Sequence, residues 1–354
     1  MIPLNAAGCV FPAGPGIALA DLALRTGFSK SRRHPFYVDR SGERVVASYF
    51  NDPGTGFDLA RWQSLTEAVL SDLLARLEPI PKPSLQQAPW QAWLVLPKPD
   101  RPGVPPDLAH ALLPTLDTWP YELEGVEAIF GGHASGLKAI EAAAKACAAE
   151  PQSIALILAV DSLVGPETLT WLENRDLLHG ARKIYEGYPR PNPYGRLPGE
   201  GAAALLLSNR HDLPAWCHIT GMAWGEEPLT YDQPRPCIGQ GLTTVARQAL
   251  TRAAQYRQRP VRHLSHDYNG EPYRADEYGF TALRLADQLD LYHVRHTPAL
   301  ISGDLGAASA VAHTALAAWS CHRRPVGADH LILASSDDPL RSALVLHARE
   351  SEAS

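Results

Sequence analysis

The sequence predicts an α/β protein made of two related halves, because one arrangement of residues occurs twice. In the first half, a glycine-rich turn at 131–136 opens an alanine-rich run at 137–149. In the second half, residues 303–309 open another alanine-rich run that reaches about Ser320. Each run is followed by apolar, strand-like segments, at 153–160 and 201–207 in the first half and at 330–335 and 343–347 in the second. Such internal repetition indicates a duplicated architecture.

The first alanine-rich run has the features of a buried helix. It contains neither glycine nor proline, and alanine has the highest intrinsic helix propensity. Leu137, Ile140 and Ala144 recur at helical spacing, but small residues cover nearly every face, so other elements can pack closely around it. His133 should then lie at or just before the helix N-terminus, where unpaired N–H groups and the macrodipole create a positive potential. The following run at 153–160 is continuously apolar, which is typical of a strand covered on both faces.

The remaining elements follow from hydrophobic periodicity and from turn residues. Further strands are expected at 4–11, 45–49, 93–96, 126–130, 216–224, 262–265 and 292–294. Further helices are expected at 16–26, 59–77, 108–113, 243–256 and 278–289. The third of these helices should have Asp107 as its N-cap and Pro114 as its stop. Residues 163–184 should combine helix and loop. Residues 185–197 should form an ordered loop over a pocket or a partner surface, and the basic cluster at 30–34 a solvated loop.

Composition excludes several classes of protein. Of the 354 residues, 45% are hydrophobic and 20% charged, as in ordinary globular proteins. A formal net charge of −6 leaves no basic footprint for nucleic acid. Five cysteines without regular spacing indicate neither a disulfide framework nor a CxxC metal site, and they favour a reducing cytoplasm. Residues 1–28 do not resemble a signal peptide, and no apolar run reaches membrane-spanning length. We expect a cytoplasmic protein without a cofactor.

Four motifs, in order along the chain, resemble those of the thiolase superfamily, and the β-ketoacyl synthase branch is the most similar. Residues 131–140 resemble the turn that carries the family's nucleophile, and 198–204 (Pro-Gly-Glu-Gly-Ala-Ala-Ala) resemble its "GEGAGALVL" strand. Residues 265–270 resemble its "AHGTGT" segment, and 303–308 its "GHxxGAAG" motif. The resemblance covers most of the chain. It implies a thiolase-like five-layer α-β-α-β-α fold from two pseudo-duplicated halves, 1–210 and 211–354, with a boundary near 209–215. It also implies a homodimer in which strands pair across the interface.

The departures from the family pattern concern its chemistry. Ketosynthases condense acyl chains with a Cys-His-His set, in which a cysteine activated at a helix N-terminus is the nucleophile. Here the cysteine position is His133, the first histidine is His266, and the second falls in a shortened motif where Asp304 is nearest. None of the five cysteines lies in a comparable turn. The chain is therefore not expected to form the family's acyl-thioester, because function depends on the site and not on the fold.

Each of these three residues has a structural and a functional interpretation. His133 should be neutral at a helix N-terminus, and it either acts as a base or fills the space of the lost nucleophile, which we favour. His266 is either an inherited hydrogen-bonded histidine or a functional one. Asp304 either caps its helix, which we favour, or belongs to the site. If the three converged, they would also suit Fe(II) or Zn, but the family carries no metal and none is expected.

Three functions are compatible with these residues. The first is a ketosynthase-like protein that has lost condensing activity and binds a partner, for which divergent thiolase-like proteins beside type VI secretion effectors suggest an accessory or chaperone role. The second is an acyltransferase or hydrolase that uses a histidine base on an acyl carrier or coenzyme A thioester. The third is a partner of an active ketosynthase, similar to a chain-length factor.

Overall fold

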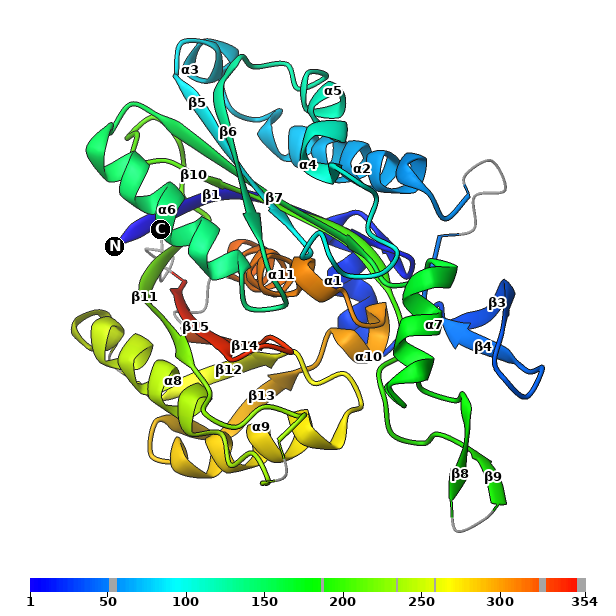
Figure 1. Cartoon of the computed structure of the whole chain (residues 1–354). Helices are drawn as coiled ribbons and strands as arrows, with labels where there is room; N and C mark the ends of the chain where they lie inside the picture. Colours follow the sequence, from blue (N-terminus) through cyan, green and yellow to red (C-terminus); the bar gives the residue numbers. More distant parts are fainter. Residues whose placement is uncertain (51–55, 186–187, 234, 258, 325–328, 349–354) are drawn as a thin grey trace.

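The computed structural model describes residues 1–50, 56–185, 188–233, 235–257, 259–324 and 329–348. One mixed sheet runs through the molecule in the order β13-β12-β14-β15-β11-β1-β10-β7-β5-β6, with the short β2 (Gly14–Pro15) paired to β1 (Figure 1). The strands of the first half are β1 (Ile2–Phe11), β5 (Trp90–Leu96), β6 (Leu123–Phe130), β7 (Ile154–Ser162) and β10 (Glu200–Leu207). Those of the second half are β11 (Cys217–Glu226), β12 (Val261–His266), β13 (Leu289–His296), β14 (Asp329–Ser335) and β15 (Leu340–His347).

The strand order shows the duplication directly. Counted along the chain, each half places its five strands in the order first, fifth, fourth, second, third. In each half the fifth strand is antiparallel to both neighbours, and the other pairs are parallel. A short antiparallel pairing of β1 with β11 joins the halves. The two pseudo-duplicated halves are thus confirmed. Their division into domains 1–210 and 211–354 stays a prediction.

Helices lie in three layers around the two halves of the sheet (Figure 1). One outer layer consists of α2 (Leu59–Leu77), α3 (Lys82–Gln86), α4 (Leu108–Ala111) and α5 (Leu113–Leu116). The central layer contains α1 (Ile17–Thr26), α6 (Gly136–Ala149), the short α10 (Ala299–Ser302) and η2 (Gly306–Ala308), and α11 (Ser309–Arg323). The other outer layer is formed by α8 (Gln240–Ala253), η1 (Ala254–Tyr256) and α9 (Pro272–Arg284). This confirms the α-β-α-β-α arrangement. To one side project α7 (Pro166–Asn174) and the hairpins β3 (Arg32–Val38)–β4 (Arg44–Ala47) and β8 (Arg182–Tyr185)–β9 (Tyr188–Pro191).

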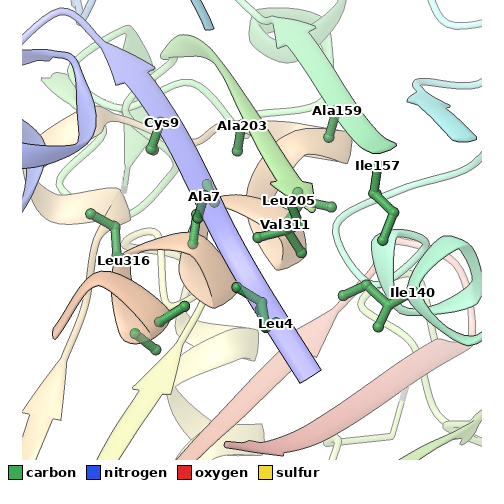
Figure 2. Close-up of a cluster of buried hydrophobic side chains, with 14 of the residues drawn as sticks. Leu4, Ala7, Cys9, Ile140, Ile157, Ala159, Ala203, Leu205, Val311 and Leu316 are labelled. Carbon is green, nitrogen blue, oxygen red and sulfur yellow. The ribbon is translucent and has the colours of Figure 1, made fainter. Parts of the chain in front are cut away.

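The central layer explains why the sequence needs small residues there. Side chains of β1, β7 and β10 point toward α6 and α11 and form one apolar cluster with them (Figure 2). At the crossing of the two helices, a Cβ added to Gly136 would lie 2.7 Å from Cγ2 of Val311. Glycine and alanine therefore permit a close approach that larger side chains would prevent. The predicted helix is confirmed and its inner face is buried, but Lys145, Ala148 and Ala149 are exposed, so it is not covered on every side as expected.

Several local predictions were wrong. Residues 30–34 are not simply a solvated loop, because β3 begins at Arg32 and His34 is fully buried, with Nε2 3.0 Å from the Val164 carbonyl oxygen. The helix expected at 278–289 begins six residues earlier, at Pro272. Proline is well tolerated in a first turn, because the N–H that it lacks would have no partner within the helix there. Pro114 likewise lies in the first turn of α5 and does not stop α4. Asp107 does occupy the N-cap position of α4, as predicted, but its side chain makes no capping hydrogen bond. Within the described residues, no helix is both long and apolar enough to span a membrane.

Candidate functional site

A cavity of about 550 Å³ opens where loops from both halves meet. The turn after β6 contributes His133 to its wall, and β7 contributes Asp161. From the second half come Gly306 of η2 and Asp337, which follows β14. Arg196 also lines the cavity. It belongs to the segment 185–197 that was expected to be an ordered loop over a pocket, but that segment includes strand β9, so the prediction of a loop was wrong in part. The size suits a small ligand, but the wall carries many charged groups.

His133 and Asp304 are in direct contact beside this cavity. Both side chains are buried, and the imidazole Nε2 lies 2.7 Å from Oδ1 of Asp304. On the other side of the ring, Nη2 of Arg274 lies 3.3 Å from Nδ1. Since a guanidinium can only donate, Nδ1 accepts, and Nε2 carries the proton donated to Asp304. Both ring nitrogens of His133 are thus engaged in hydrogen bonds.

Asp304 is held by neighbours from several segments. Its Oδ1 also accepts the Gly306 N–H at 2.8 Å, and its Oδ2 accepts a hydrogen bond from Nδ2 of Asn269 at 2.7 Å. The N-cap positions of η2 and α11 are Leu305 and Ala308, so the expectation that Asp304 caps its helix was wrong. Burial by itself would raise the pKa of Asp304, but His133 and the nearby guanidinium groups hold it well below its usual value. Asp304 therefore stays an anion and is not a proton donor near neutral pH.

Two buried arginines form the rest of this network. Arg196 donates to Glu271 at 2.8 Å and to Asp337 at 3.0 Å, and it lies 3.7 Å from Asp304. Its side chain is only 2% exposed and that of Glu271 8%, so this ion pair is shielded from solvent, whereas the Asp337 side chain is 30% exposed. Burial opposes ionisation of Asp337, yet the two guanidinium groups hold its pKa below the usual range. The pairs thus keep their charges despite burial.

Arg274 is the second cation of the network. It donates to Glu271 at 3.0 Å, to Asp267 at 3.1 Å and to Asp337 at 2.9 Å, and also to the Ser335 carbonyl. Two arginines thereby face four carboxylates: Asp267, Glu271, Asp304 and Asp337. Burial raises the pKa of Asp267, against the lowering effect of Arg274.

His266 lies apart from the other two predicted residues. Within the described part of the chain, no hydrogen bond or ion pair joins it to His133 or Asp304, and it is not part of the cavity wall. Its Nδ1 accepts the Tyr268 N–H at 3.2 Å, its ring stacks on Tyr278 with centroids 3.8 Å apart, and Nε2 is buried without a partner. Burial, helped by nearby positive groups, lowers the pKa of His266 to about 3.

His313 is a residue that the sequence analysis missed. It lies fully buried in α11, its Nδ1 has no partner, and burial lowers its pKa to about 3. His133 and Asp304 both influence its charge, and His313 in turn influences that of His266. Arg196 and Arg274 were missed as well. A single arginine in a loop or helix carries no local signal of the carboxylates that it will meet.

The arrangement offers little acid–base chemistry. His133 has no free lone pair, Asp304 is a paired anion, and His266 lies outside the cavity. The cysteines are free and buried, and burial raises the pKa of Cys9, Cys147 and Cys237, which opposes thiolate formation. None of the five cysteines lines the cavity.

Comparison with known proteins finds matches among solved structures only. No protein-family model and no curated protein sequence matches the chain. Solved structures do match it. The ishigamide ketosynthase/chain length factor has a TM-score of 0.71 at 19% identity, over 98% of this chain and 99% of that one.

This chain has the ketosynthase fold. The ketosynthase from module 6 of the bacillaene synthase of Bacillus subtilis 168 has a TM-score of 0.74 at 13% identity, over 98% of this chain and 72% of that one. AntDE:AntF, a type II PKS acyl-carrier protein in complex with its ketosynthase bound to the hexaketide, has a TM-score of 0.75 at 11% identity, over 98% of both chains. The resemblance seen in the motifs is thereby confirmed at the level of the fold.

Proposed function

We propose that this chain is a ketosynthase-like protein that does not condense acyl chains and acts by binding a protein partner. The observation that carries this proposal is the buried network at the position of the nucleophile. There His133 donates to Asp304 and accepts from Arg274, so the residue that replaces the cysteine is a structural member of an ion-pair network. A side chain whose nitrogens are both engaged is poorly suited to attack a thioester or to remove a proton.

The geometry gives less support to an acyltransferase or hydrolase. Such an enzyme needs a base within hydrogen-bond reach of its substrate. His266 is only 3% exposed and lies outside the cavity wall. Binding of an acyl carrier or coenzyme A thioester would therefore have to occur without the family's covalent step.

Partner binding is supported by the edge strand β6, which directly precedes the His133 turn. It ends the sheet order, so one of its edges has no neighbouring strand in the described chain, and most of its residues are exposed or half-buried. Val126 is 37% and Phe130 45% exposed. An open edge of this kind favours pairing with another strand. We propose a homodimer through β6, or the equivalent pairing with an active ketosynthase.

One neighbour is itself described as a ketosynthase/chain length factor, which supports a partner role. An accessory role beside a secreted effector is the other version of the same proposal. Neighbouring genes for a carrier protein and a complete ketosynthase would favour the role as a ketosynthase partner. Neighbouring genes for an effector and a spike protein would favour the accessory role in secretion. Affinity capture of the tagged protein from its own cells would identify the partner.

The decisive experiment combines labelling with a measurement of assembly. A radiolabelled acyl thioester should leave no stable mark on the protein, and light scattering should show a dimer that Val126→Lys on β6 dissociates. Leu291→Lys is the matched control, because Leu291 is 84% exposed on β13, the edge strand at the other end of the sheet. A stoichiometric thioester on any cysteine would refute the loss of condensation. Equal assembly of both variants would refute the role of β6.

A further inference from the structure

A second cluster of buried polar groups lies in the C-terminal half. Its members come from three segments: Glu227 directly follows β11, Cys237 precedes α8, and Glu277 belongs to α9. They are 2%, 4% and 1% exposed. One ligand atom of each, a carboxylate oxygen or the thiol sulfur, lies within 4.8 Å of those of the other two. None of the three lines the cavity described above.

The contacts around Glu227 leave one of its oxygens unused. Oε2 accepts the N–H of Gly241 at 2.7 Å and that of Leu242 at 3.4 Å, in the first turn of α8. Oε1 is buried and has no hydrogen-bond partner. A buried carboxylate oxygen without a partner is unfavourable, so a ligand that supplies one is expected to bind there.

Glu277 is already oriented by a cation. Nε of the fully buried Arg341 donates to its Oε1 at 2.5 Å, and the same guanidinium donates to the carbonyls of Ser336, Asp338 and Leu340. The Cys237 sulfur lies 3.8 Å from this Glu277 oxygen. An arginine that fixes a carboxylate in this way resembles the outer-shell partners that orient metal ligands.

We infer that Glu227, Cys237 and Glu277 form a binding site for a divalent zinc ion. A thiolate with two carboxylates is a donor set for a borderline-soft cation and a poor one for Mg²⁺ or Ca²⁺, which prefer oxygen alone. Burial keeps the Cys237 thiol protonated in the free protein, so zinc binding would release that proton to solvent as the Zn–S bond forms. The three ligands then carry three negative charges, which Arg341 and one Zn²⁺ balance to zero. Zinc bonds of about 2.0–2.3 Å in a tetrahedron separate ligand atoms by about 3.3–3.8 Å, so the cluster needs a contraction on the order of 1 Å.

The site would also influence the first cavity. Glu227 and Cys237 flank the segment whose residues Thr230, Tyr231, Asp232 and Gln233 form part of the cavity wall. A metal bound to both flanking residues holds the two ends of that segment together and lowers its conformational entropy. Zinc would therefore order one wall of the cavity from a distance, whether or not the protein binds a partner through β6.

The test measures metal content on the intact chain. Wild-type protein that has been equilibrated with excess zinc and then desalted should contain about one zinc ion per chain, as measured by elemental mass spectrometry. Cys237→Ser and Glu227→Gln should weaken zinc binding by ten-fold or more. Cys147→Ser, which changes a buried cysteine of α6 outside the site, should not, and neither should His133→Ala. Cobalt in place of zinc should give a sulfur-to-metal charge-transfer band that Cys237→Ser removes.

Two results would overturn the proposal. One is wild-type protein that holds only traces of zinc after equilibration, a result that does not depend on the folding of any variant. The other is an unchanged zinc content in folded Cys237→Ser and Glu227→Gln, with folding checked by circular dichroism. As a second readout, chelation should speed hydrogen exchange at residues 230–233 in the wild type.

Discussion

Replacing Arg196 with methionine should destabilise the protein strongly, because it leaves buried carboxylates without a counter-charge. Arg196 contacts Glu271 and Asp337 and lies 3.7 Å from Asp304, and only Arg274 would remain to balance these groups. Breaking a buried pair by removing one partner costs about 3–5 kcal/mol. For a urea m-value of about 3 kcal/mol/M, the urea concentration at the midpoint of unfolding should fall by about 1–2 M.

A control and a pH dependence make this prediction sharper. Arg25→Met removes an ion pair with Asp21 in which the arginine side chain is 51% exposed, so it should cost only about 0–1 kcal/mol. In Arg196→Met the pKa of Asp304 and Asp337 should rise, so the folded variant binds protons more readily than the wild type. The destabilisation should consequently be smaller at pH 5 than at pH 8. A cost no larger than that of Arg25→Met would refute the view that Arg196 holds the network together.

The other predictions concern His133, its helix and the buried histidines. His133→Ala should keep the fold and any dimer, and cost about 1–3 kcal/mol by urea unfolding, because Asp304 retains Asn269 and the Gly306 N–H. Gly136→Val should abolish folding or assembly in gel filtration, since its Cβ would already meet Val311 at 2.7 Å; equal tolerance of both variants would contradict the assignment of α6 as a buried helix. His266 and His313 have a pKa near 3 when folded against 6.5 for an ordinary histidine, so the unfolded chain binds more protons below pH 6.5. The free energy of unfolding should therefore decrease as the pH is lowered, by at most about 2 kcal/mol for each of these two histidines between pH 6.5 and 5. His313→Asn should make this dependence on pH weaker, and an unchanged dependence would contradict the lowered pKa of His313. Metal analysis should find zinc binding unaffected by His133→Ala, and its loss there would place a metal at His133.

The layered fold could be predicted from the sequence because its signals are local. Glycine turns before alanine-rich runs, and continuous apolar segments after them, reflect packing requirements that act on neighbouring residues. Two of the three predicted site residues also meet, because His133 and Asp304 lie at the starts of the two duplicated central segments. Elements whose ends depend on distant contacts were placed less well, as β3 shows with the burial of His34 against Val164.

The chemistry of the site was decided by the tertiary structure. Whether His133 is a base depends on what lies against its two nitrogens, and those groups, on Arg274 and Asp304, are 141 and 171 residues away along the chain. The same holds for Arg196, whose carboxylate partners come from other loops. Zinc ligands at Glu227, Cys237 and Glu277 have no spacing that a motif could reveal. The sequence by itself determined the duplicated, layered fold and the presence of a histidine at position 133, because these follow from periodicity and residue identity. The tertiary structure decided which charges meet, because ion pairing in a buried site depends on distances between segments that sequence order does not constrain.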